Sequence, residues 1–220
     1  MATAPPRSRF RRFVVTGFKL TLYAFLISAV ALCVAVAVAV SQLPSYGELV
    51  RRDDLGQMIR VRAADGRVIH AMGPSFGQWL PYGEIAPVMR DAMIAVEDRR
   101  FRSHPGVDPI STVRGLWLGL TGGTRVRGVS TITQQLARNI FLNNDRTFAR
   151  KLREGILAFA LEWRFSKDQL LELYLNRVYF GGGAYGIDAA SRRFFGHSAT
   201  ELSIPEAAII ASRITGGMSS

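Results

Sequence analysis

An uncharged run of 21 residues, from Leu20 to Val40, constrains this chain more than any other feature of its sequence. A helix rises about 1.5 Å per residue, so the run is long enough to cross a hydrocarbon layer of roughly 30 Å. The alternative is a cleaved signal peptide, whose apolar segment usually has about 7 to 15 residues and ends at a small-x-small site. The residues that follow, Ser41 to Pro44, contain no clear Ala-x-Ala site. The sequence therefore favours an uncleaved membrane anchor.

Charges on the two sides of this run predict its orientation. The segment Ser41 to Val50 carries one acid and no cation. Five cations and no acid precede the run: Arg7, Arg9, Arg11, Arg12 and Lys19. Because cytoplasmic flanks are enriched in positive charge, the N-terminus is predicted inside the cytoplasmic (inner) membrane and the rest outside it. The expected division is a cytoplasmic basic tail (1–19), a transmembrane helix (20–41), a membrane-proximal linker with a β-hairpin (42–80) and an external domain (81–220).

The net charge of +11, from 28 Lys and Arg against 17 Asp and Glu, limits the classes of partner. A basic external domain tethered to a membrane suits anionic lipid head groups or a diphosphate substrate. Nucleic acid fits poorly, because the arginines are dispersed, no zinc-finger or RNA-binding signature occurs, and the anchor would place the domain on the wrong side of the membrane. We therefore expect membrane lipid, and no nucleic acid, among the partners.

Local patterns predict a mainly α chain, with a single N-terminal transmembrane helix, a helical domain and a small membrane-proximal β element. Met58 to His70 alternates around Asp65-Gly66, which is typical of a hairpin. Ser166 with Gln169, and Ser203 with Glu206, match capping boxes. The expected helices run from Pro87 toward Glu97, over 110–120, 130–142, 147–165, from Lys167, over 184–195, and from Ile204.

The apolar stretch Ile110 to Leu120, which contains Trp117, has two interpretations. It could be a core helix, or it could dip into the surface of the bilayer. We expect a core position and keep partial membrane contact as the alternative. The glycine-rich loop that follows, Gly119 to Gly128, is expected to be mobile.

Glu97 and Asp98 end an apolar helical pattern just before Arg99 and Arg100. A solvated helix end with ion pairs would account for most runs of this kind. Here the run continues through an aromatic residue, a histidine and a glycine, as Phe101, His104 and Gly106. This continuation indicates a shaped loop, which favours a functional role for the two acids.

Positions 131, 134, 135, 138 and 139 have the spacing of one helical face, which would carry Thr131, Gln134, Gln135, Arg138 and Asn139. Amides and hydroxyls suit sugar hydroxyls, and a cation suits phosphate. A solvated face would more often carry Lys and Glu pairs. This pattern therefore predicts a polar wall of a sugar or phosphate site.

Two further acids allow both structural and chemical interpretations. Glu154 shares a helical stripe with apolar residues, which indicates either a cleft or an exposed pairing with Arg150 four residues earlier. Glu172 and Asn176 share a face, and a structural role is as consistent with this pattern as a catalytic one. No His-Glu-x-x-His motif, cysteine cluster, Gly-x-Ser-x-Gly or Ser-x-x-Lys occurs in the sequence.

From about Pro81 to Ala211, the chain resembles the family 51 peptidoglycan glycosyltransferases. The segments that carry the resemblance match the first four signature motifs of that family: Glu97-Asp98-x-x-Phe101-x-x-His104-x-Gly106, Gly128-x-Ser130-Thr131-Ile132-Thr133-Gln134-Gln135-Leu136, Arg150-Lys151-x-x-Glu154 and Leu171-Glu172-x-Tyr174-Leu175-Asn176. Arg138 stands where the family usually has Lys. The fifth motif ends in His197 in place of the usual Lys.

The resemblance implies a lysozyme-like helical fold with a membrane-facing jaw, and polymerisation of lipid II into glycan strands. It implies that Glu97 is the general base, and that Glu154 is a second essential glutamate that orients the diphosphate directly or through a divalent cation, Mg²⁺ or Mn²⁺. No other cofactor is implied. The substrate-binding residues implied are Asp98, Phe101, His104, Ser130, Thr131, Gln134, Gln135, Arg138, Asn139, Arg146, Arg150, Lys151 and Glu172.

Two rival functions remain open from the sequence. A lytic muramidase would share the fold class and would cleave glycan without a lipid-linked donor. An inactive membrane-anchored scaffold would bind other cell-wall synthesis proteins. After Ala211 the chain departs from the Pro-rich segment usual in the family, so the domain is expected to be truncated at its C-terminal end. The resemblance then implies the N-terminal part of a class A penicillin-binding protein, or a short monofunctional relative.

Overall fold

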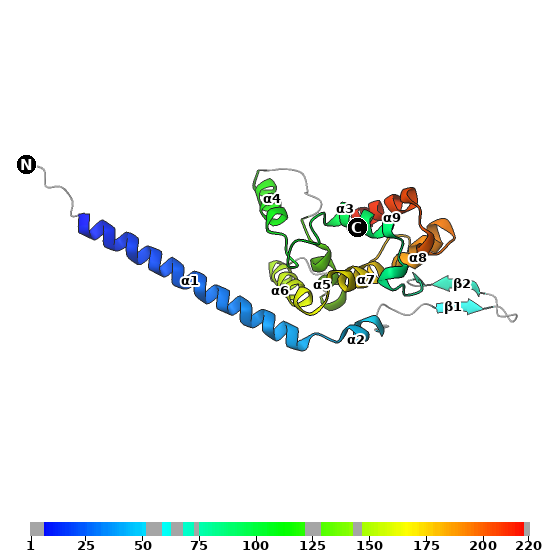
Figure 1. Cartoon of the computed structure of the whole chain (residues 1–220), viewed down its shortest axis with the longest axis horizontal. Coiled ribbons are helices and arrows are strands. Elements are labelled where there is room, and N and C mark those ends of the chain that lie inside the picture. The colour runs from blue at the N-terminus through cyan, green and yellow to red at the C-terminus, as the bar shows by residue number, and fades with distance from the viewer. Residues whose placement is uncertain are drawn as a thin grey trace, which may run out of the picture.

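The computed structural model describes residues 7–51, 59–62, 68–72, 75–121, 129–142 and 147–217. One long helix, α1, leads into a helical body with a small hairpin beside it (Figure 1). The mainly α fold class is therefore confirmed. The helices of the body are α2 (Tyr46–Arg51), α3 (Pro87–Glu97), α4 (Pro109–Leu120), α5 (Ile132–Phe141), α6 (Phe148–Arg164), α7 (Lys167–Arg177), α8 (Ile187–Phe195) and α9 (Ile204–Gly217), with short 3₁₀ turns at Tyr82–Glu84 and Ala199–Glu201.

The N-terminal helix α1 covers Arg7–Gln42, so it begins inside the predicted tail and is longer than the predicted span 20–41. Its segment Phe13–Gln42 is long and apolar enough to cross a membrane. Near its C-terminal end, Val36, Ala39 and Val40 pack against the core of the body, where α1 contacts α6. The remainder of α1 extends away from the body (Figure 1), as expected for a membrane anchor.

The predicted hairpin is confirmed. Strands β1 (Ile59–Arg62) and β2 (Val68–Met72) pair antiparallel, and Ile59 lies opposite Met72. The turn that the sequence places at Asp65-Gly66 lies outside the described residues.

A second strand pair was not foreseen. β3 (Ser75–Phe76) pairs in parallel with β4 (Ala184–Tyr185). The prediction of a helix over 184–195 is therefore wrong at its start, because α8 begins at Ile187. Gly186 makes this switch with a φ of 81°, and a Cβ there would lie 2.6 Å from the carbonyl oxygen of Asn176. An alanine at 186 would meet both the strained φ and this close approach.

Helix α7 lies at the centre of the body. From Leu170 to Arg177 every side chain except that of Glu172 is buried, as expected for a helix surrounded on all sides. Its start matches the prediction, since Ser166 and Gln169 form the expected capping box. Helices α5, α6 and α8 pack against α7, and α9 packs against α3. The core thus holds the C-terminal end of α3 and the N-terminal end of α5 on one rigid frame.

Helix α4 departs from the expected core position. Asp108 caps it as predicted, by accepting a hydrogen bond from the N–H of Ile110. Its apolar face, however, is solvent-exposed, with exposed fractions of 63 to 77% for Ile110, Val113, Trp117 and Leu120. These four residues fall on one side of the helix, and α4 stands at the edge of the body (Figure 1). The core position is therefore wrong, and partial membrane contact stays a prediction. Most of the predicted mobile loop, 119–128, lies outside the described residues.

Candidate active site

Glu97, the last residue of α3, has an incompletely satisfied buried carboxylate. Its side chain is only 8% exposed. The Oε2 atom accepts a hydrogen bond from Nε2 of Gln135 at 2.7 Å, whereas Oε1 has no partner among the described residues. Burial raises the pKa of Glu97 and the charge of Asp98 adds to this, while the Gln135 hydrogen bond and the charge of Arg138 oppose it. A buried carboxylate oxygen without a donor can accept a proton.

Asp98 and His104 tie the loop after α3 to the start of α5. The carboxylate of Asp98 lies 2.9 and 3.0 Å from Nε2 of His104 and accepts the N–H of Ile132 at 3.1 Å. The N–H of Gly106 donates to Nδ1 of His104 at 3.1 Å, which assigns the imidazole proton to Nε2. Phe101 is buried edge-on against His104. These contacts shape the loop next to Glu97.

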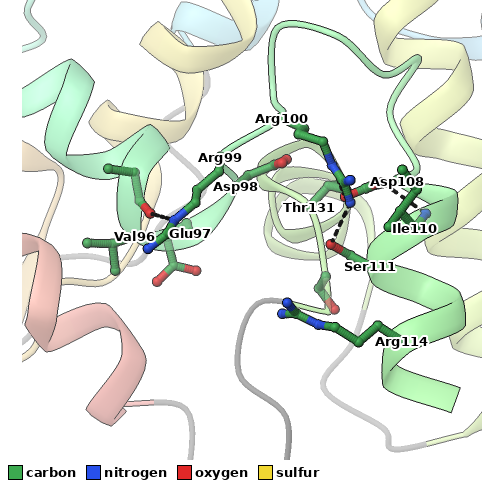
Figure 2. A pocket seen from close by; sticks show the side chains of 12 residues that line it. Val96, Glu97, Asp98, Arg99, Arg100, Asp108, Ile110, Ser111, Arg114 and Thr131 are labelled. Atoms are coloured by element: carbon green, nitrogen blue, oxygen red, sulfur yellow. Dashed lines mark hydrogen bonds and ion pairs between the residues drawn. The ribbon is translucent and has the colours of Figure 1, made fainter. Parts of the chain in front are cut away.

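A pocket of about 620 Å³ opens beside Glu97, between the end of α3 and α4 (Figure 2). Arg99, Arg100 and Arg114 all line it. Arg100 is paired with Asp108 at 2.6 Å, so its charge is balanced. Arg99 bonds only to a neutral backbone carbonyl among the described groups, and Arg114 extends from α4 toward the α3 side of the pocket (Figure 2). The pocket therefore combines a free carboxylate oxygen with cations that suit an anionic ligand.

The predicted polar face of α5 is divided between different partners. The helix begins at Ile132, two residues later than predicted, because Thr131 is its N-cap. Thr131 accepts the N–H of Gln134 and Gln134 accepts the N–H of Thr131, so both side chains form a capping box. Gln135 instead points to Glu97. Asn139 is exposed.

The buried carboxylate of Glu154 in α6 lies among three cations. Its side chain is fully buried, accepts hydrogen bonds from Arg150 and from Nζ of Lys151 at 2.9 Å, and forms an ion pair with Arg138 at 3.9 Å. The pairing with Arg150 exists as the sequence suggested, but the carboxylate is buried, so the exposed interpretation is wrong. Nζ of Lys151 also donates to the hydroxyl of Ser130 at 2.8 Å.

In this cluster three cations surround one carboxylate. Burial lowers the pKa of Lys151 to about 8, and the charges of Arg138 and Arg150 contribute further. Burial and the charge of Arg150 likewise lower the pKa of Arg138. Such a group of cations suits an anionic ligand. Arg146, the remaining predicted cation, lies outside the described residues.

Glu172 and His197 form hydrogen bonds away from the pocket beside Glu97. The two carboxylate oxygens of Glu172 accept Nε1–H of Trp79 at 2.9 Å and the N–H of Tyr82 at 2.8 Å, so the structural interpretation accounts for this residue. Nε2 of His197 lies 3.0 Å from the carboxylate of Glu206, whose hydrogen bond raises the pKa of His197. The pocket lining includes neither residue.

A protein-bound divalent cation does not fit the described residues. No group of three or more His, Cys, Asp or Glu side chains is gathered in the described part of the chain. Glu154, the residue that the resemblance connects with a metal, is surrounded by three positive charges that would repel a cation.

Sequence reasoning missed several residues near Glu97. Arg99, Arg114 and Ser111 line the pocket, yet they were not among the predicted site residues. Tyr174 donates its hydroxyl hydrogen to Oε1 of Gln135 at 3.1 Å. The one feature of the sequence that could have indicated Tyr174 is a hydroxyl-bearing side chain within the leucine-rich pattern of α7.

Comparison with known proteins identifies relatives of similar sequence. Penicillin-binding protein 1F of Bacillus subtilis is 51% identical over 128 residues, which are 58% of this chain and 18% of that protein. Penicillin-binding protein 1A of Haemophilus influenzae is 41% identical over 160 residues (73% and 19%), and that of Escherichia coli is 43% identical over 153 residues (70% and 18%). The chain thus spans about a fifth of the length of these relatives. Residues 65–218 match the family model described as "Transglycosylase", and the chain therefore belongs to the transglycosylase family.

Proposed function

We propose that this chain is a peptidoglycan glycosyltransferase that polymerises lipid II into glycan strands. The observation that carries the proposal is the buried carboxylate of Glu97, which lies beside a pocket lined by cations and has one oxygen without a partner among the described residues. Family membership and the names of the relatives support the same activity.

In the proposed reaction, Glu97 takes the proton from the 4-hydroxyl of the acceptor GlcNAc. The acceptor oxygen then forms a bond to the anomeric carbon of the donor MurNAc, with inversion. The bond between that carbon and the lipid diphosphate breaks, and the diphosphate leaves with the electron pair. The raised pKa of Glu97 makes it a stronger base than an exposed glutamate. Proton transfer to a positioned base contributes roughly 10² to 10⁴-fold to such a rate.

The cations provide two places for anionic groups. The cluster of Arg138, Arg150 and Lys151 suits the diphosphate that leaves the donor, because fixed positive charge stabilises the charge that develops there. Arg99 and Arg114 line the pocket beside the base and suit the diphosphate of the acceptor lipid. A reaction between two lipid-linked substrates requires an anion-binding group for each of the two diphosphates.

In this proposal the chain is a single-pass protein of the cytoplasmic (inner) membrane, with its N-terminus inside and its catalytic domain outside. The long apolar segment of α1 and the exposed apolar face of α4 support this placement. Lipid II, the growing glycan strand and membrane lipid are the proposed partners, together with other cell-wall synthesis proteins.

The test is polymerisation of lipid II by the detergent-solubilised chain, compared with Glu97→Gln. This substitution keeps the shape and removes the base, so we expect the rate to fall by about 10² to 10⁴-fold. Glu84→Gln, at an exposed glutamate, is the matched control and should keep the wild-type rate. A wild-type chain that makes no glycan would contradict the proposed function, and a fully active Glu97→Gln would contradict the role of Glu97. Release of fragments from purified glycan would indicate the muramidase instead.

A further inference from the structure

The amide of Gln135 lies between the base and a buried phenol. Its Nε2 donates to Oε2 of Glu97 at 2.7 Å, and its Oε1 accepts the hydroxyl of Tyr174 at 3.1 Å. Nε2 also lies 3.5 Å from the carbonyl oxygen of Ser130. Tyr174 is fully buried in the middle of α7, so the rigid centre of the body holds one end of this chain of hydrogen bonds.

The two ends of a glutamine amide differ chemically, since the oxygen only accepts and the nitrogen only donates. Burial, together with the negative charge of Glu97, raises the pKa of Tyr174 well above its usual value, so the phenol keeps its proton. The phenol therefore donates to Oε1 of Gln135, which turns Nε2 toward Glu97. A flipped amide would place its oxygen against the carboxylate, two acceptors with no hydrogen between them.

This orientation determines which oxygen of Glu97 is available. Because Oε2 is held by Gln135, Oε1 is the atom left without a partner among the described groups. We infer that Tyr174 is a positioning residue for the reaction proposed above, which acts through Gln135 so that Glu97 presents Oε1 to the acceptor hydroxyl. The inference rests on the proposed function and adds a residue that does not itself contact the substrate.

The alternative is that Tyr174 only fills the core. The two roles differ in their effect on Glu97, since a phenylalanine keeps the ring packing and removes the donor. The amide of Gln135 would then be free to turn its oxygen toward Glu97. The other charges that face Glu97, those of Asp98 and Arg138, would stay in place. A positioning role thus predicts a further rise in the pKa of Glu97, which a purely packing role does not.

We expect Tyr174→Phe to lower kcat by between about 2- and 13-fold, the range for one neutral hydrogen bond, with little change in KM. The acid limb of the kcat profile should move to higher pH, because Glu97 becomes harder to ionise. Tyr46→Phe is the matched control, since the Tyr46 hydroxyl oxygen is also buried but lies at α2. Tyr46→Phe should leave both kcat and the acid limb unchanged.

A double-mutant cycle tests whether Tyr174 acts through Gln135. Gln135→Met keeps the length of the side chain and removes the amide. In that background Tyr174→Phe should cause no further loss of kcat. Equal losses in both backgrounds, or an unchanged acid limb, would overturn the inference, as would a Tyr174→Phe chain with wild-type kcat.

A measurement independent of activity separates this inference from the proposed function. The pKa of Glu97 can be followed by carboxyl ¹³C NMR in the detergent-solubilised wild type, Tyr174→Phe and Tyr46→Phe chains. A higher pKa in Tyr174→Phe alone supports the inference even if lipid II is not polymerised. The same pKa in all three chains overturns it even if lipid II is polymerised.

Discussion

Replacement of Glu154 by glutamine should strongly destabilise the folded chain. The carboxylate is fully buried and is shared by Arg138, Arg150 and Lys151. Removal of one partner from a buried ion pair costs about 3 to 5 kcal/mol, because the side chains of Arg138 and Arg150, which are 15% and 17% exposed, lose the carboxylate that they share. For a folded region of this size each kcal/mol lowers Tm by about 2 to 4 °C. The expected decrease is therefore about 6 to 20 °C near pH 7.

Two conditions should reduce the decrease in Tm caused by Glu154→Gln. Lys151 has a pKa of about 8, below its usual value of 10.5, so its charged form costs stability, and this cost develops as the pH falls from about 10.5 to about 8. Without Glu154 the pKa of Lys151 falls further, so the difference in Tm from wild type should shrink as the pH rises toward about 8. Pyrophosphate should also raise the Tm of Glu154→Gln, since an anion that binds the folded cluster stabilises it by mass action.

Thermal unfolding of the detergent-solubilised chain, followed by far-ultraviolet circular dichroism, measures these effects. The control is Asp168→Asn, which breaks the exposed pair between Arg102 and Asp168 and should cost less than about 1 kcal/mol. If Glu154→Gln unfolds at the same temperature as Asp168→Asn, the carboxylate is not what holds the three cations together, and the reasoning is refuted.

Three further results are expected. The kcat/KM for lipid II should follow a bell-shaped pH curve, because the pKa of Glu97, raised by burial, sets the acid limb and the loss of charge of Lys151, with a pKa of about 8, sets the alkaline limb. Lys151→Arg should remove the alkaline limb, and an unchanged limb would exclude Lys151 as its source. Arg114→Gln should raise the KM for lipid II by about tenfold, the value of one charge-assisted hydrogen bond, with kcat and Tm unchanged; a wild-type KM would argue against substrate contact at Arg114. Gly106→Ala should lower the free energy of unfolding, measured with urea, by about 1 to 3 kcal/mol and reduce kcat. The φ of Gly106 is 99°, and the added Cβ would lie 2.7 Å from the carbonyl oxygen of Ala158. A wild-type urea midpoint would contradict this prediction.

Helix starts were predictable wherever their hydrogen bonds are local. The Ser166 and Gln169 pair, the cap at Asp108 and the proline at position 87 all lie where the structure begins a helix. Each of these signals acts within about four residues, so the sequence contains both partners side by side. The start of α5 was placed too early because Thr131 was assigned to the helical face, whereas its side chain serves as the cap.

Features that depend on distant segments were not predictable in this way. The helix predicted from Ala184 is a strand at its start because Ser75 pairs with Ala184, far away in sequence. Helix α4 was expected in the core because its composition is apolar, but composition alone does not say whether another element covers that face.

The sequence by itself determined an apolar segment long enough to span a membrane, most helix boundaries and the order of motifs that indicates a transglycosylase. The tertiary structure alone decided how the polar side chains are used. Of two adjacent glutamines, Gln134 caps its own helix, while Gln135 reaches Glu97 and Tyr174, which lie 38 and 39 residues away in the sequence. Local hydrogen bonds can be predicted from neighbouring residues, because both partners are close in the sequence. Burial and long-range partners arise only when separate helices pack together.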